Sequence, residues 1–210
     1  MKRSEMSTVA IVDYGMGNID SIVRAIEESG GSVLVSNNPV DFETATHIIL
    51  PGVGSFSAAM ESLSKLKLIN VLKEQVTKYK IPFLGVCLGM QLLATKGHEG
   101  GDHDGLDLIK GEVVLLKPQD LQQRIPHIGW NEVIFAKQSP LFNNIETGKD
   151  FYFVHSYHYK CKHEQDILAY TPYCGKFVSV IGRENIFGTQ FHPEKSQRVG
   201  FELLKNFLQM

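Results

Sequence analysis

A cysteine with a glycine two positions away on each side occurs in the segment Gly85-Val86-Cys87-Leu88-Gly89, and this arrangement can present a thiol as a nucleophile. The apolar run 81–86 predicts a buried strand before it, and the strong helix formers 90–94 follow it. Small flanking residues permit a tight strand-to-helix turn, as in the Gly-x-Ser-x-Gly nucleophile elbow. A helix N-terminus at such a turn favours the thiolate. A buried structural cysteine fits the same pattern, so the segment alone leaves both interpretations open.

A thiol nucleophile needs a base, and the base needs a group that orients it. The segment Phe191-His192-Pro193-Glu194 contains a candidate for each, with His192 as the base and Glu194 as the orienting group. His192 directly follows a predicted strand over 186–191, and Pro193 prevents that strand from continuing. Glu194 can turn back and hydrogen-bond the imidazole. Open α/β sheets place their sites at the carboxyl ends of parallel strands, so Cys87 and His192 could meet there. The competing interpretation is a surface turn with a solvated charge.

The third candidate element, Pro51-Gly52-Val53-Gly54, directly follows a predicted strand over 46–50. Glycine-flanked backbone can aim N–H groups at a developing oxyanion, and the Leu88 N–H can supply a second donor. A phosphate cradle is the rival interpretation of a glycine-rich loop after a strand. Neither Gly-x-Gly-x-x-Gly nor Gly-x-x-x-x-Gly-Lys-Ser/Thr occurs at 51–57, which disfavours nucleotide binding.

The elements that must position these groups alternate between strand and helix in the first half of the chain. Such alternation predicts an open, mostly parallel sheet with helices on both faces. The expected strands are 8–12, 32–35, 46–50 and 81–86, and the expected helices are 19–28, 58–67 and 69–79.

The second half changes to short β-rich segments separated by turn residues, which predicts antiparallel hairpins added to the parallel sheet. A closing helix over 197–209 should turn Val199, Leu203, Leu204 and Phe207 inward. We expect one domain over 8–210, preceded by a flexible tail over 1–7. The expected strands are 112–116, 130–135, 151–159, 167–171, 177–181 and 186–191.

Composition narrows the class of protein. The chain has 210 residues and a net charge of −2, which disfavours nucleic acid or an anionic membrane as the main partner. The N-terminus has no apolar signal region, and no run of 18 apolar residues occurs. Three cysteines are too few for a disulfide framework, so we expect a reducing, cytoplasmic location.

A metal site is not expected, because the seven histidines other than His192 show no zinc-type spacing with the cysteines. His155 and His158 fall within one predicted strand, where positions three apart face opposite sides. His98 and His103 belong to a Gly/Asp-rich loop and should be solvated.

Taken in order, these segments resemble the class I glutamine amidotransferases, whose catalytic set is Cys, His and Glu. Pro-Gly-Val-Gly, in place of the more common Pro-Gly-Gly, and Gly-Trp-Asn are typical of the branch that forms the glutaminase subunit of imidazole glycerol phosphate synthase. The resemblance runs nearly end to end, through DYGMGNI at 13–19, LPGVGSF at 50–56, GVCLGMQLL at 85–93, HIGWN at 127–131, FYFVHSY at 151–157 and GTQFHPEKS at 188–196.

The resemblance implies a role for each of these residues, without a metal or cofactor. Cys87 would attack the carboxamide of glutamine and form a glutamyl thioester, His192 would move the protons, and Glu194 would hold the histidine tautomer. The usual serine before the acidic substrate residue is replaced here by Gly97. The implied oxyanion residues are Gly52, Val53, Gly54 and Leu88, and the implied substrate-binding residues are Gln91, Glu99, Ser156 and Tyr157.

The resemblance also implies a partner. Family members of this branch form a heterodimer with a (β/α)8-barrel cyclase subunit, to which they channel ammonia in histidine biosynthesis. A Val-Gly pair can need a peptide flip before its N–H points at the oxyanion, and Gly54 makes that flip accessible. We therefore expect low basal activity that rises when the cyclase subunit binds its nucleotide. The implied interface residues are Asn18, Trp130, Asn131, Tyr152 and Lys195.

Three other functions fit part of the pattern. A paralogous subunit would supply ammonia to a sugar amidotransferase of surface-polysaccharide biosynthesis, and the unusual segment 97–109 is compatible with it. A catalytically silent partner-stabilising subunit would have no need for Cys87, His192 and Glu194 together. A thiol peptidase on a similar fold is disfavoured by Gln91 and by the sequence His-Pro-Glu-Lys.

Overall fold

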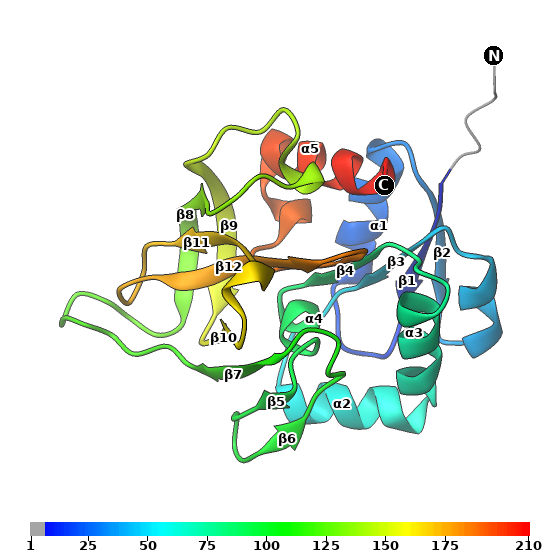
Figure 1. Ribbon diagram of the computed structural model, residues 1–210, viewed down its shortest axis with the longest axis horizontal. Coiled ribbons are helices and arrows are strands. Elements are labelled where there is room, and N and C mark those ends of the chain that lie inside the picture. Colours follow the sequence, from blue (N-terminus) through cyan, green and yellow to red (C-terminus); the bar gives the residue numbers. More distant parts are fainter. Residues whose placement is uncertain (1–6) are drawn as a thin grey trace.

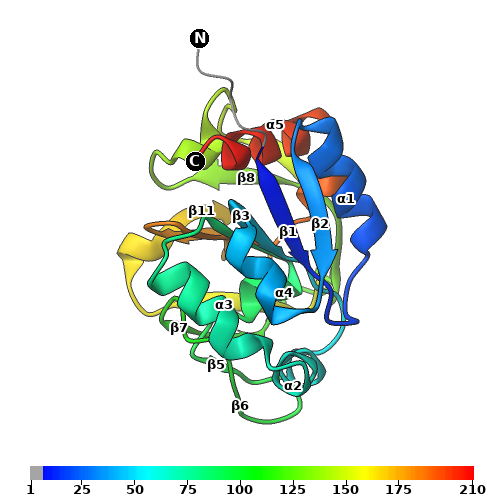
Figure 2. The same ribbon diagram turned by 90° about the vertical axis from the view of Figure 1, so that its right-hand side faces the viewer.

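A computed structural model describes residues 7–210, and its central feature is one mixed sheet with helices on two faces (Figures 1 and 2). Most of the expected tail, residues 1–6, lies outside the described residues. The parallel half of the sheet has the order β2-β1-β3-β4-β13. Its strands are β1 (Thr8–Val12), β2 (Ser32–Ser36), β3 (His47–Leu50), β4 (Phe83–Val86) and β13 (Ile186–Thr189).

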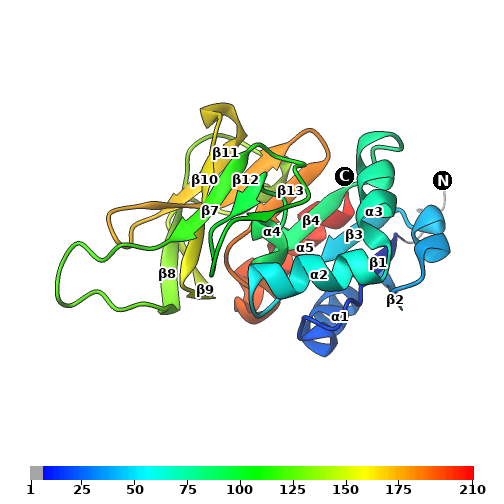
Figure 3. The same cartoon turned by 90° about the horizontal axis from the view of Figure 1, so that it is seen from below.

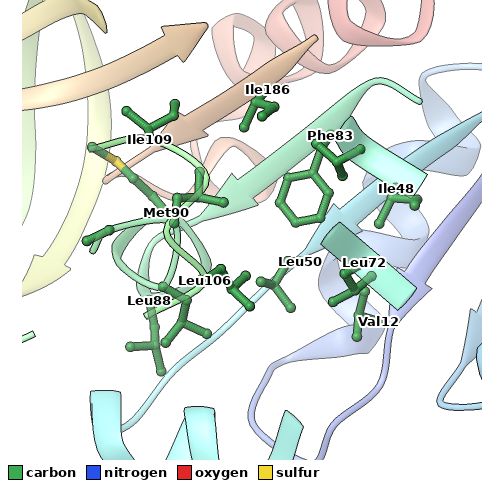
Figure 4. Close-up of a cluster of buried hydrophobic side chains, with 14 of the residues drawn as sticks. Val12, Ile48, Leu50, Leu72, Phe83, Leu88, Met90, Leu106, Ile109 and Ile186 are labelled. Carbon is green, nitrogen blue, oxygen red and sulfur yellow. The ribbon is translucent and has the colours of Figure 1, made fainter. Parts of the chain in front are cut away.

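Helices cover both faces of these parallel strands, as the alternating pattern predicts. Helices α1 (Ile19–Glu28) and α5 (Gln197–Leu208) pack on one face, and α2 (Phe56–Lys65) and α3 (Leu68–Thr77) contribute to the core on the other. Strand β1 serves both faces, because Val9 and Ile11 join one hydrophobic cluster while Ala10 and Val12 join the other. Burial on both sides explains why the strands are continuous apolar runs. Figure 4 shows the second cluster, with Leu50, Phe83 and Met90 at its centre.

The second half of the chain adds the antiparallel strands (Figure 3). Strand β12 (Phe177–Arg183) pairs antiparallel with β13, and the sheet continues from it as β10-β7-β5-β6, while β11 links β12 to the β8–β9 pair. These strands are β5 (Lys96–Gly97), β6 (His103–Asp104), β7 (Gly111–Leu115), β8 (His127–Phe135), β9 (Lys149–His155), β10 (Tyr157–Cys161) and β11 (Ile167–Thr171). Short 3₁₀ helices are η1 (Pro39–Thr44), η2 (Pro140–Phe142), η3 (Glu164–Asp166) and η4 (Pro193–Lys195).

The prediction of a single strand over 151–159 is wrong. The segment breaks at Ser156, because β9 pairs with β8 whereas β10 pairs with β7. His155 and His158 therefore belong to different strands, and the alternation argument that separated them does not apply. The change of partners between two adjacent strands carries no signal in the local residue pattern.

The helix after Cys87 is also shorter than its helix-forming residues predict. Helix α4 spans only Leu88–Gln91. The carbonyls of Leu92 and Ala94 accept hydrogen bonds from the backbone of the loop at 105–109, so tertiary contacts end the helix there. The closing helix agrees with its prediction in Leu203, Leu204 and Phe207, which are buried, while Val199 is half-buried.

Across residues 7–210, the helices are all too short or too polar to cross a membrane.

Candidate active site

Four parallel strands end at the same edge of the sheet and deliver the candidate residues there. The loop 13–18 follows β1, the loop 51–55 follows β3, Cys87 follows β4, and the segment 190–192 follows β13. Strands β4 and β13 are in register, with Val86 opposite Thr189, so the residues after both strands emerge side by side. Parallel pairing therefore brings Cys87 and His192 together from distant parts of the chain.

Cys87 occupies a strained turn between β4 and α4. Its backbone has φ +55° and ψ −109°, a conformation that side chains rarely adopt, and its N–H donates to the Thr189 carbonyl at 2.7 Å. The side chain is 6% exposed. Around the sulfur, the Val154 carbonyl and the Gln190 Nε2 each lie 3.8 Å from Sγ. A strained, polar setting of this kind is typical of a functional thiol and not of a cysteine that only fills the core.

His192 is held by Glu194 in the way the sequence predicts. The imidazole Nδ1 lies 2.8 Å from Glu194 Oε1, and both side chains are buried. Burial by itself lowers the pKa of His192, but its interactions with the Cys87 sulfur and the Glu194 carboxylate outweigh burial and raise that pKa to about 10. The Nε2 atom is buried and has no well-aligned hydrogen-bond partner among the described residues. The ring therefore has Nδ1 fixed and Nε2 available for proton exchange with the thiol.

Replacing Glu194 with glutamine should lower the pKa of His192 by about one to three pH units, because the neutral amide no longer stabilises the imidazolium. In the wild type, the imidazolium persists at neutral pH and loses its proton as the pH rises through about 10. An NMR titration of the His192 ring measures the shift. Glu27→Gln on the exposed side of α1 is the control, and an unchanged His192 titration in Glu194→Gln would contradict the assignment.

Both expected oxyanion donors are occupied. The Leu88 N–H donates to the Gly52 carbonyl at 3.3 Å, and the Val53 N–H donates to the Met16 carbonyl at 3.1 Å. The peptide joining Gly52 to Val53 thus turns its oxygen toward the nucleophile elbow and its N–H toward the loop after β1. A cavity of about 10 Å³, lined in part by Val53, lies beside His192, and it has room for about one water.

The residues expected to bind substrate divide into two groups. Gln91, 6% exposed, donates from Nε2 to the Tyr157 carbonyl at 2.9 Å, which brings the helix after the nucleophile to the break after Ser156. Glu99 instead accepts from the Phe56 N–H at 2.7 Å, so its carboxylate is engaged with the first residue of α2. This placement is compatible with a structural role for Glu99.

Of the five expected interface residues, two, Trp130 and Tyr152, lie opposite one another on the outer side of β8 and β9. Trp130 is 47% exposed and makes an edge contact with Tyr152, at 5.9 Å between ring centroids. Asn18 is exposed, and Lys195 is half-buried in η4. Asn131 is one position from Trp130 and turns to the opposite side of β8, where it contacts His127 and the Pro172 carbonyl.

Three further polar residues belong to this region, although the residue patterns gave no role to them. Gln190 is completely buried, and its amide lies between the Gln91 carboxamide and the Cys87 sulfur. His127 and His155 are buried and hydrogen-bonded to one another. The glutamine two residues before His192 could have been identified from the sequence as a candidate site residue. The histidine pair could not, because it depends on strand pairing between β8 and β9.

No group of three or more metal-ligating side chains occurs within residues 7–210. An open groove of about 790 Å³ runs along residues 135–147, away from the candidate residues.

Comparison with known proteins gives a consistent result. The family model "Glutamine amidotransferase class-I" matches residues 10–210. The chain is 48% identical to the imidazole glycerol phosphate synthase subunit HisH 1 of Campylobacter jejuni (strain RM1221), over 96% of this chain and 100% of that one. It is 46% identical to subunit HisH of Aquifex aeolicus (strain VF5), over 96% of each chain.

Solved structures confirm the fold. A glutamine amidotransferase of known structure superposes with a TM-score of 0.73 at 15% identity, over 96% of this chain and 97% of that one. PurLQS from Thermotoga maritima gives a TM-score of 0.70 at 18% identity, over 98% of this chain and 97% of the matched chain. The matched family model covers nearly the whole chain, and the near-full-length relatives agree with it: the protein belongs to the class I glutamine amidotransferase family.

Proposed function

We propose that this protein is the glutaminase subunit of an imidazole glycerol phosphate synthase, which releases ammonia from glutamine for a (β/α)8-barrel cyclase subunit. The observation that carries the chemistry is the strained Cys87 turn beside a His192 that is fixed by Glu194. The pathway rests on the near-full-length relatives, which are named as subunits of that synthase.

The proposed reaction has two steps at Cys87. The thiolate attacks the carboxamide carbon of glutamine, the C–N bond breaks, and His192 gives its proton to the leaving ammonia. The glutamyl thioester is then hydrolysed by a water whose proton returns to His192, which regenerates the thiolate and releases glutamate. Glu194 keeps the Nδ1–H of the ring engaged, so Nε2 is the atom that exchanges protons.

The arrangement of the oxyanion loop supports low activity for the isolated chain. Rotation of the peptide between Gly52 and Val53 would break its two present hydrogen bonds, free the Leu88 N–H, and turn the Val53 N–H toward the substrate oxygen. This peptide has Gly52 on its N-terminal side, so Gly52, and not the expected Gly54, permits the accompanying change in backbone angle. Two donors would then stabilise the tetrahedral oxyanion, and one such donor is typically worth about 10²–10³ in rate.

The outer face of β8 and β9 is the proposed docking face for the cyclase. Ile128 is 61% exposed and Trp130 is 47% exposed, an apolar pair that a partner could cover. Tyr152, which contacts Trp130, accepts a backbone hydrogen bond from the His192 N–H at 2.9 Å. The proposed docking face is thus directly bonded to the segment that carries the catalytic base.

Glutamate release should rise about 10²–10³-fold when the purified chain is combined with the cyclase of its genome and a nucleotide ligand of that cyclase, because the oxyanion donors become available. A coupled glutamate assay measures the rate with and without each component. Full activity of the isolated chain would overturn the proposed gating. Stimulation only by a sugar-modifying synthase would move the protein to the polysaccharide paralogue, and no glutamate release in any combination would indicate a silent subunit.

A further inference from the structure

A series of hydrogen bonds connects side chains of β8 to the break between β9 and β10. It includes none of the residues of the proposed triad. Asn131 Nδ2 lies 3.3 Å from His127 Nε2, and His127 Nδ1 lies 3.1 Å from His155 Nε2. His155 Nδ1 then lies 2.8 Å from the Tyr157 carbonyl. Both histidines are buried, with exposures of 4% and 6%.

The donor and acceptor of each hydrogen bond in this series follow from the chemistry of the groups. A carbonyl oxygen only accepts, so His155 Nδ1 carries a hydrogen, and its neutral ring accepts at Nε2. His127 must then donate from Nδ1 and accept at Nε2. The Asn131 amide nitrogen is a donor and completes the sequence. Both rings are therefore held in the Nδ1–H tautomer by their partners.

Their surroundings keep both rings neutral. Burial lowers the pKa of His127 to about 4 and that of His155 to about 3. The nearby titratable rings of His158 and His192 disfavour a charge on His155 further. His127 stacks on Tyr173 at 4.0 Å between ring centroids. A proton added to His155 would place its Nε2–H against the N–H of His127, so the neutral, directed form is the compatible one.

At its other end, this series of hydrogen bonds reaches the side chain of Gln91 through the Tyr157 carbonyl. The Tyr157 carbonyl accepts from His155 and also from Gln91 Nε2, at 2.9 Å. The same nitrogen donates to Gln190 Oε1 at 3.1 Å. With both amide hydrogens of Gln91 used, only its oxygen remains to contact a substrate, as an acceptor for an N–H donor.

We propose that His127 and His155 are positioning residues that fix the Tyr157 carbonyl and, through it, the acceptor orientation of Gln91, and so set the affinity for glutamine. This inference rests on the proposed function, because that function assigns Gln91 and the backbone at Tyr157 to the glutamine pocket. A contact of this kind forms equally in the ground state and in the transition state, so its loss appears in KM and not in kcat.

The decisive comparison is His127→Leu against His127→Asn, measured as glutaminase of the full chain with its cyclase and nucleotide ligand. Both side chains remove the ring that stacks on Tyr173, and they have nearly the same shape. Asparagine retains a donor at the position of Nδ1, whereas leucine leaves His155 Nε2 unpaired. His127→Leu should raise KM about tenfold with kcat within about twofold of the wild type, and His127→Asn should recover most of the loss.

Equal impairment of the two variants would reduce His127 to a packing residue, and an unchanged KM in both would also overturn the proposal. A second measurement needs no variant and no activity. Nitrogen-15 NMR of the wild-type chain at neutral pH should show the Nδ1–H tautomer for both rings, and an Nε2–H tautomer in either would contradict the directed chain. Failure of the proposed function would appear separately, as a wild-type complex without glutamate release.

Discussion

Cys87→Ala should lower glutamate release by more than about 10⁴-fold, because the covalent route through the thioester disappears with the sulfur. Of the three cysteines, only Cys87 lies next to His192. Cys161 is on β10, and Cys174 is in the turn before β12. The loss should appear in kcat of the complex with its cyclase, with glutamine binding retained because no substrate-binding group is altered. A glutamate assay for kcat and calorimetry for binding separate the two quantities.

Cys174→Ala is the matched control, because it removes a thiol away from His192 and should leave the rate unchanged. Residual activity of Cys87→Ala near the wild-type level would reject the thiol as nucleophile. Equal losses in the two variants would point to a general effect of cysteine replacement on folding, which circular dichroism of each variant detects.

Gly89→Ala should destabilise the fold by more than about 3 kcal/mol or prevent folding, because no space exists for a methyl group in α4. A Cβ at this position would lie 1.8 Å from the Leu50 carbonyl oxygen and 2.8 Å from its carbon. The obstacle is backbone at the end of β3, so a side-chain rotation cannot relieve it. Urea unfolding followed by circular dichroism measures the change in free energy.

Gly17→Ala provides the control for this prediction. A Cβ at Gly17 would meet Pro51 at 3.6 Å, which is an ordinary van der Waals contact. Its free energy of unfolding should remain within about 1 kcal/mol of the wild type. Wild-type stability of Gly89→Ala would show that α4 can move away from β3, and the tight elbow geometry would then not be required for the fold.

The residues of the proposed triad could be identified from residue types and their local setting. Cys87 follows an apolar strand and has glycines on both sides, and His192 follows another strand with a proline and a carboxylate behind it. Both signals are local. The parallel pairing of β4 with β13 joins strands from the two halves of the chain, and the strand–helix alternation of the first half does not specify it. The sheet brings Cys87 and His192 together at one edge, because parallel strands end on the same side of a sheet.

Other features depended on tertiary contacts. Whether the Gly52–Val53 peptide turns its N–H toward Met16 or toward the substrate is a choice between backbone partners from different loops, and residue types do not specify it. The break at Ser156 arises because β9 and β10 have different neighbours.

The directed pair of His127 and His155 exists only because two strands place the rings opposite one another, and Asn131 joins them because β8 turns it away from Trp130. The sequence by itself determined which groups can react, because nucleophile, base and orienting carboxylate are encoded by residue type and local spacing. Apart from the local bond between His192 and Glu194, the tertiary structure decided which hydrogen bonds surround those groups, because these bonds join segments whose approach is set by the packing of the whole sheet.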